Sequence, residues 1–257
     1  MVDVLDIAAY QAGDPDPVDH DDPPNPSESN PYGLTIDRNG DALIADAAGN
    51  DLIRVTPDGH PTTVARFDLQ SVATDHLPAD FPGGPLPPAL DAESVPTTVT
   101  IGPDGAIYVG ELKGFPFRPG TSNIWRIKPG AEGAWCSVNE PDPTHMCSLY
   151  SDGYTAIQDI AFDKRSGQLY VYELAAGGVL QFEPALDPES GAPFPPAVLL
   201  QVKHNREGEQ RTELAAGQLS QPGGVVVVNG KVYVTDGVFT SGRLIRISRD
   251  DSSNTKA

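Results

Sequence analysis

Four segments of this chain repeat one pattern, and this repetition restricts its possible folds more than any other feature. The segments begin at Asn30, Val95, Ala156 and Gln221, and each has a short apolar strand, a tight turn and a second strand of alternating polarity. After a loop, each segment continues into a third short strand, "LIRV", "IWRI", "VLQF" or "LIRI". Repeated units of three or four antiparallel strands predict the blades of an all-β propeller.

The repeats place the whole chain, residues 1–257, in one predicted propeller domain. Their spacing exceeds the roughly 40 to 50 residues of a bare blade, and the excess lies in the insertions 68–94, 136–154 and 184–220. The 26 Gly and 26 Pro residues suit short strands joined by tight turns. Long loops on a repetitive scaffold usually carry the binding surface, so we expect function on these loops.

The start of the chain lies outside the repeats. The segment "VDVLDIAAY", residues 2–10, is predicted to be a single strand, and residues 11–29 an acidic, proline-rich loop. The strand would either complete the last blade and close a four-bladed ring, or belong to a blade lost from a shortened chain. The segment lacks the basic and apolar regions of a signal peptide.

The chain is strongly acidic, with 17 basic against 36 acidic residues and a net charge of -19. Such a charge repels nucleic acid and anionic membranes. No apolar stretch reaches the roughly 18 residues needed to cross a bilayer. We therefore expect a small molecule or a protein as partner, with neither nucleic-acid binding nor membrane insertion.

Cys136 and Cys147 are the two cysteines, and their spacing fits no zinc site. A disulfide that closes a long loop is favoured if the protein is exported. Two free thiols are the alternative.

An acidic residue ends the second strand of every repeat; these blade acids are Asp46, Glu111, Glu173 and Asp236. If the four carboxylates point into one shared space, they form a candidate site for a cation such as Ca²⁺, which takes six to eight oxygen ligands. The sequence favours a structural interpretation, in which three of the acids pair with a base on the third strand. The predicted pairs are Asp46 with Arg54, Glu111 with Arg126 and Asp236 with Arg246.

The stretch "KGFPF" occurs in a single repeat. It places Phe115 and Phe117 on a proline-stiffened loop, with Trp125 on the strand that follows. Exposed rings here would form an apolar contact for a flat or aromatic ligand, whereas buried rings would cap the blade.

These segments also carry a family resemblance. The stretches "SNPYGL", "YVGELKGFPF" and "QPGGVVVVNGKVYVTD", within residues 28–247, resemble the ScyD/ScyE family of propeller proteins encoded with scytonemin pigment biosynthesis. More distantly, the repeats resemble NHL and SMP-30/gluconolactonase propellers. The resemblance implies about six blades, of which four are recognisable in this chain, and an exported protein that is extracellular or periplasmic. It implies no established reaction.

Two functional hypotheses follow. The first is a binding or scaffold protein without catalytic activity, which holds a small molecule or a protein partner on its loops. The second is a metal-dependent hydrolase or lyase of the SMP-30 type. For the second, the nearest candidate ligands are Asn30, Glu93, Asn123 and Asp159, whose spacing is not that of the family.

Overall fold

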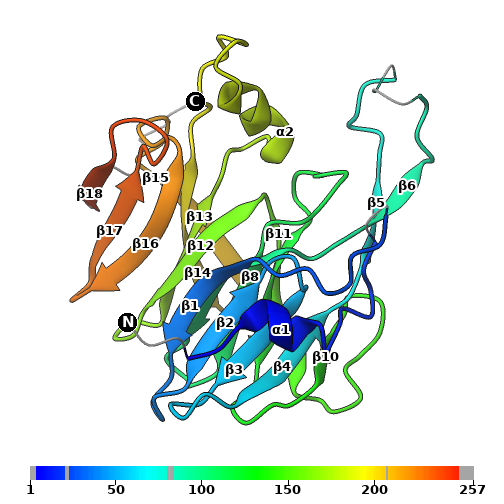
Figure 1. Ribbon diagram of the computed structural model, residues 1–257. Coiled ribbons are helices and arrows are strands. Elements are labelled where there is room, and N and C mark those ends of the chain that lie inside the picture. Colours follow the sequence, from blue (N-terminus) through cyan, green and yellow to red (C-terminus); the bar gives the residue numbers. More distant parts are fainter. Residues whose placement is uncertain (1–3, 21–22, 80, 82–83, 207, 249–257) are drawn as a thin grey trace.

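The fold is all-β, with four antiparallel blades arranged as a β-propeller (Figure 1). The computed structural model describes residues 4–20, 23–79, 81, 84–206 and 208–248. Both the predicted fold class and the four predicted blades are confirmed. Within the described residues, no helix combines the length and the apolar content needed to span a membrane.

Each blade is a sheet whose first strand lies innermost. Blade 1 contains β1 (Pro31–Ile36), β2 (Ala42–Asp46), β3 (Asp51–Val55) and β4 (Pro61–Phe67), with β10 (Ala134–Cys136) added in parallel to β4. Blade 2 contains β7 (Pro96–Ile101), β8 (Ile107–Glu111), β9 (Ser122–Ile127) and β11 (Cys147–Tyr154). Blade 3 contains β12 (Ile157–Asp163), β13 (Gln168–Glu173), β14 (Val198–Asn205) and β15 (Gly208–Leu214). Blade 4 contains β16 (Pro222–Val228), β17 (Lys231–Asp236) and β18 (Arg243–Ile247).

The remaining elements are short and lie outside the blades. A hairpin of β5 (Gln70–Ala73) and β6 (Ala89–Ala92) projects from the connection between blades 1 and 2. The described residues also contain three short helices: α1 (Ile7–Gln11), α2 (Val179–Phe182) and η1 (Glu183–Leu186).

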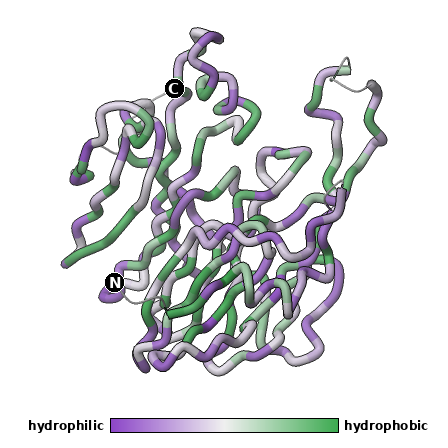
Figure 2. Tube along the Cα trace, viewed as in Figure 1, coloured by the Kyte–Doolittle hydropathy of each residue, from purple (hydrophilic) through white to green (hydrophobic). Residues whose placement is uncertain are grey.

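The core consists of apolar side chains packed between neighbouring blades. Trp125 and Phe67 lie between blades 1 and 2, Tyr154 and Val171 between blades 2 and 3, and Leu199 and Val234 between blades 3 and 4. Successive side chains of a strand point to opposite faces of the sheet, so those of blades 2 and 3 face the two neighbouring blades in turn. Figure 2 shows the hydrophobic residues gathered along the strands, while the connecting loops are largely hydrophilic.

The four blades form an open arc. β1 packs against β7, β7 against β12 and β12 against β16, whereas β16 and β1 do not pack against each other in this way. The outer faces of the two end blades accordingly expose apolar side chains. Leu34 of β1 is 66% exposed and Leu244 of β18 is 73% exposed.

The prediction of a strand over residues 2–10 is wrong, although Val2 and Asp3 lie outside the described residues. The segment forms helix α1, which lies against blade 1 (Figure 1). Asp6 explains the helix start, because its carboxylate accepts a hydrogen bond from Ala9 N at 3.0 Å and caps the first turn. This segment therefore closes no ring with blade 4.

The third strand of blade 3 is also not where the repeats placed it. The stretch "VLQF" is helix α2, which follows Gly177 and Gly178, the latter with φ +68°. The third strand is instead β14, whose residues 198–202 pair antiparallel with residues 169–173 of β13. The insertions 136–154 and 184–220 thus contribute the strands β11, β14 and β15 to blades 2 and 3.

Candidate functional site

The second strands of all blades end at one side of the propeller. We call this side the loop face and define it by residues 68–79, 81, 84–95, 112–121, 174–197 and 237–242, which connect the blade strands there. In Figure 1 it is the upper side, where the β5–β6 hairpin and α2 lie.

The four blade acids lie at the base of the loop face, and all are buried. Each carboxylate accepts a hydrogen bond from the segment that leads into the first strand of its own blade. The donors are Asn30 N to Asp46 (2.6 Å), Ser94 Oγ to Glu111, Thr155 N to Glu173 (2.8 Å) and Ser220 N to Asp236 (2.7 Å). The acids therefore fix the entry of the chain into each blade, in agreement with the structural interpretation.

The predicted arginine partners are wrong. Arg54 pairs with Glu132 at 2.7 Å and Arg126 pairs with Asp104 at 2.7 Å, while Arg246 forms no ion pair with any described residue. Register explains the error, because Arg54 lies opposite Leu43, three residues before the acid that ends β2. Three residues of strand separate the two groups by about 10 Å.

The structure also does not gather the blade acids into one cation site. Each carboxylate stays in its own blade, and the described part of the chain contains no group of three or more His, Cys, Asp or Glu that could hold a metal ion. The candidate ligands of the SMP-30 hypothesis do not fit a metal centre either. Asn123 is hydrogen-bonded to Glu111, and Asp159 accepts hydrogen bonds from Thr98 Oγ1 at 2.6 Å and Val225 N at 2.7 Å.

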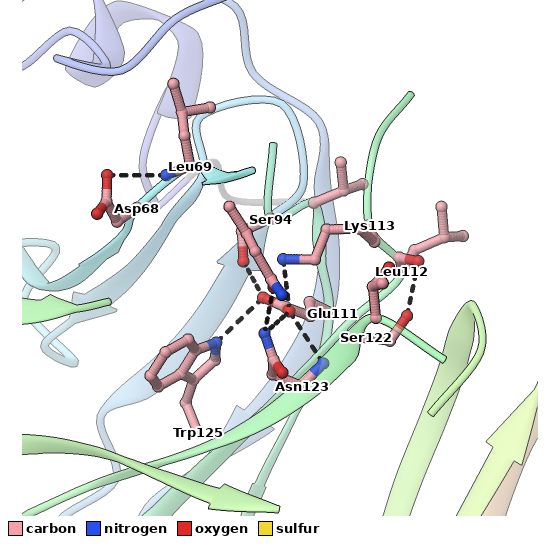
Figure 3. A network of polar contacts seen from close by, with 12 residues as sticks. Asp68, Leu69, Ser94, Glu111, Leu112, Lys113, Ser122, Asn123 and Trp125 are labelled. Atoms are coloured by element: carbon pink, nitrogen blue, oxygen red, sulfur yellow. Dashed lines mark hydrogen bonds and ion pairs between the residues drawn. The ribbon is translucent and has the colours of Figure 1, made fainter. Parts of the chain in front are cut away.

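Glu111 has the most extensive contacts of the four acids (Figure 3). Its carboxylate accepts hydrogen bonds from Ser94 Oγ, from Asn123 N and Nδ2, and from Trp125 Nε1 at 3.0 Å. Lys113 completes the set, with its Nζ 2.7 Å from Glu111 Oε1. The lysine side chain is only 2% exposed, so this is a buried ion pair whose charges are matched within the protein.

The buried pair anchors the loop over residues 112–121. Lys113 has φ +75°, which turns the chain back toward the protein, and Phe115 and Phe117 follow on the loop face. Their rings meet edge to face, with centroids 5.8 Å apart, and Phe81 packs against Phe115 at 5.5 Å. Phe115 is 37% exposed. These three residues, which we call the first aromatic cluster, give the loop face a partly exposed apolar surface.

The connection between blades 1 and 2 holds this loop from its other side. Arg118 pairs with Asp75 and donates to Ala73 O at 3.2 Å, and the ring of His76 lies 2.9 Å from Pro116 O. The insertion 68–94 and the loop over residues 112–121 therefore build the first aromatic cluster together.

Trp125 is not part of this surface, so its predicted role in ligand binding is wrong. The side chain is 2% exposed, packs against Phe67 and donates to Glu111. Its position on β9 directs the ring into the core between blades 1 and 2.

A second aromatic cluster lies on blades 3 and 4. Phe194 and Phe239 stack with an interplanar angle of 5°, and Phe182 of α2 packs against both rings. Phe239 is 59% exposed. The loop face therefore carries two aromatic groups, contributed by different blades.

Glu173 is the blade acid with the fewest neutralising contacts. Its carboxylate accepts one hydrogen bond, from Thr155 N, and no cation pairs with it among the described residues. Burial raises the pKa of Glu173 to about 7, because the hydrogen bond from Thr155 N and the more distant charge of Arg211, which both lower it, do not offset the effect of burial. Thr155 Oγ1 in turn accepts a hydrogen bond from Gly120 N at 3.0 Å. Thr155 thus connects Glu173 to the loop over residues 112–121, which carries Phe115 and Phe117.

The disulfide between Cys136 and Cys147 is present, as the sequence favoured. It joins β10 at the edge of blade 1 to β11 at the edge of blade 2.

Sequence reasoning missed Phe81, Lys113 and the second aromatic cluster. Lys113 follows Glu111 by two residues in a stretch shared by no other repeat, and that irregularity was the available signal. Phe81 and Phe194 lie in long insertions, where no periodic pattern shows which side chains meet.

Comparison with known proteins gives resemblance to solved structures only. No family model and no curated protein sequence matches this chain. Virginiamycin B lyase from Staphylococcus aureus is 15% identical with a TM-score of 0.48, and the match covers 89% of this chain and 55% of the lyase. A gluconolactonase from Xanthomonas campestris is 14% identical with a TM-score of 0.49, covering 84% of this chain and 58% of the other. A chain of a nidogen/laminin complex is 16% identical with a TM-score of 0.41, and the match covers 90% of this chain and 81% of the other.

The chain thus spans little more than half the length of the lyase and the gluconolactonase that it resembles.

Proposed function

We propose that this chain is a binding propeller of the ScyD/ScyE type, exported from the cell, which holds a small molecule or a protein partner on its loop face. The observation that carries the proposal is the first aromatic cluster. Phe115 and Phe117 are partly exposed, and the buried pair of Glu111 and Lys113 fixes the loop that bears them. Partly exposed aromatic rings on a rigid support bind apolar surfaces at a small cost in conformational entropy.

The chemistry of the loop face favours a neutral or cationic ligand with a flat apolar part. A net charge of -19 repels anions, and the rings supply stacking surfaces. Export is supported by the disulfide, because disulfides persist in oxidising compartments.

The alternative of a metal-dependent hydrolase or lyase has less support. Such an enzyme needs several side chains that hold a metal with an open coordination position. The described residues provide no group of three or more acidic, histidine or cysteine side chains for this purpose.

A neutral aromatic dye, Nile red, tests the proposal. We expect saturable binding to the wild-type protein and at least a tenfold weaker affinity in the variant Phe115→Ala/Phe117→Ala, measured by fluorescence titration. The matched control is Leu34→Thr/Leu244→Thr, which removes two exposed apolar side chains from the end blades. This variant should bind the dye saturably with the affinity of the wild type. Equal affinities of the wild type and the double phenylalanine variant would contradict the proposal.

A further inference from the structure

A buried acidic cluster lies where helix α1 meets blade 1. Asp46 and Asp51 are register partners at the ends of β2 and β3, and both side chains have no exposed surface. Gln11, the last residue of α1, is equally buried and points its amide at both carboxylates. Asp46 also accepts hydrogen bonds from Ser29 Oγ, Asn30 N and Gly49 N. Among the described residues, the Gln11 amide is the one group that donates a hydrogen bond to the Asp51 side chain.

The charges in this cluster do not balance. Two further acids lie near Asp46 and Asp51. Asp14, whose charge acts on Asp51, accepts a hydrogen bond from Thr63 of β4. Asp16 accepts a hydrogen bond at 3.0 Å from Nδ2 of Asn50, the residue before Asp51. Arg66, which pairs with Asp14, is the one cation near them among the described residues. Four carboxylates against one guanidinium leave an excess of negative charge, and burial makes this excess costly.

Two oxygen atoms of the cluster lack any partner, which is the independent sign of an absent ligand. Oδ1 of Asp51 and Oε1 of Gln11 are fully buried and form no hydrogen bond. The contacts of the Gln11 amide are long, since its Nε2 lies 3.4 Å from Asp46 Oδ2 and 3.2 Å from Asp51 Oδ2. Buried polar atoms of folded proteins are nearly always satisfied, so two adjacent exceptions require an explanation.

We propose that a small hard cation, with Ca²⁺ as the expected ion, binds between Asp46, Asp51 and Gln11. Carboxylate and amide oxygens are the ligands that Ca²⁺ takes. In the structure, Gln11 Nε2 lies between the two carboxylates. A rotation of the amide by 180° exchanges its nitrogen and oxygen, so that Oε1 faces the ion instead. The ion would then bind the Gln11 amide oxygen and the Asp51 carboxylate, and it would reduce the negative excess.

The site is structural rather than catalytic, and it is independent of ligand binding on the loop face. All three ligands are buried, and Gln11 belongs to the helix that covers part of blade 1. Gly49 makes room for this arrangement, because a Cβ at that position would lie 2.3 Å from Gln11 Nε2. The cation would join α1 to the ends of β2 and β3, so its removal should loosen the helix first.

Thermal unfolding of the full chain tests this inference, after treatment with a chelator and dialysis. We expect added Ca²⁺ to raise the Tm of the wild type by about 5 to 10 °C at saturation, with a heat of binding for one ion per chain in isothermal titration. Mg²⁺ and K⁺, added separately, show whether the site selects Ca²⁺ or takes hard cations in general. The variant Asp51→Asn should lose the response, whereas Asp91→Asn, which changes an exposed carboxylate on β6, should keep it.

A second variant covers the case in which Asp51→Asn fails to fold. Gln11→Ala removes the amide ligand on a single-turn helix and should weaken Ca²⁺ binding at least tenfold by isothermal titration. The inference is overturned if none of the three ions changes the Tm or gives a heat of binding with the wild type. It is also overturned if Asp51→Asn responds to Ca²⁺ as the wild type does.

Discussion

Lys113 determines what Glu111 can do. A glutamate at the end of a strand, beside a loop of unusual sequence, has the position expected of a catalytic acid. In this protein, the Glu111 carboxylate is instead occupied by internal contacts. The buried ammonium group of Lys113 lies 2.7 Å away, and Asn123 and Trp125 donate hydrogen bonds. Glu111 thus supports the loop over residues 112–121.

Glu173 differs from Glu111 because no buried cation accompanies it, and its titration should be visible in the stability of the protein. The pKa of Glu173 is about 7 in the folded state, against the ordinary value of 4.5 for a glutamate side chain. The folded protein therefore binds this proton more tightly than the unfolded chain does. The stability that the proton provides is complete below pH 4.5 and is lost as the pH rises through 7.

We expect Glu173→Gln to remove this pH dependence and to stabilise the protein at pH 8 by about 3 kcal/mol relative to the wild type. Glutamine keeps the acceptor for Thr155 N without the buried charge. Urea unfolding at pH 5 and pH 8 measures the effect. Glu140→Gln, at an exposed position, is the control and should leave the difference between the two pH values unchanged. A wild-type stability that does not fall between pH 5 and 8 relative to Glu173→Gln would refute this assignment.

At the scale of elements, the repeats predicted the first two strands of every blade because alternation and turn residues are local signals. The third and fourth strands were harder to predict. β15, "GEQRTEL", has mostly exposed side chains, and only its pairing with β14 makes it a strand. The same limit applies to the candidate site, because contacts such as Phe81 with Phe115 arise from the packing of separate insertions.

The short α1 and α2 helices show the converse error. Both occur in stretches of alternating apolar residues that also suit a strand. The Asp6 cap and the two glycines before α2 favour a helical turn instead. Propensity over four or five residues is too weak to decide such a case without tertiary contacts.

The disulfide joins elements of two blades, so its loss should weaken their outer edges. Cys136 and Cys147 are 11 residues apart, and a closed loop of this length contributes about 3 kcal/mol in the chain-entropy model. We expect Cys136→Ala/Cys147→Ala to lower the free energy of unfolding by roughly that amount, measured in urea. Reductant should destabilise the wild type similarly and leave the double variant unchanged. An equal response of both proteins to reductant would show that the bond does not stabilise the fold.

For the whole molecule, the main consequence of the open arc is that one face of blade 1 and one face of blade 4 have no neighbouring blade within the described residues. The face of blade 1 exposes Tyr32, Leu34 and Ile36, and the face of blade 4 exposes Val226, Val228 and Leu244. In a closed propeller, such side chains pack against the adjacent blade. Apolar surface of this extent on an isolated chain favours association, although the net charge of -19 opposes it by repulsion between molecules.

These opposing effects predict association that depends on ionic strength. The average molar mass of the protein in solution should rise with protein concentration. The rise should be steeper at 0.5 M than at 0.05 M salt, because salt screens the repulsion but leaves the apolar attraction intact. Leu34→Thr/Leu244→Thr should reduce this increase, measured by light scattering. Since both side chains are more than half exposed, their replacement removes little buried area and should change the Tm by less than about 2 °C. If the double variant associates as strongly as the wild type, the end faces are not the surfaces through which the molecules meet.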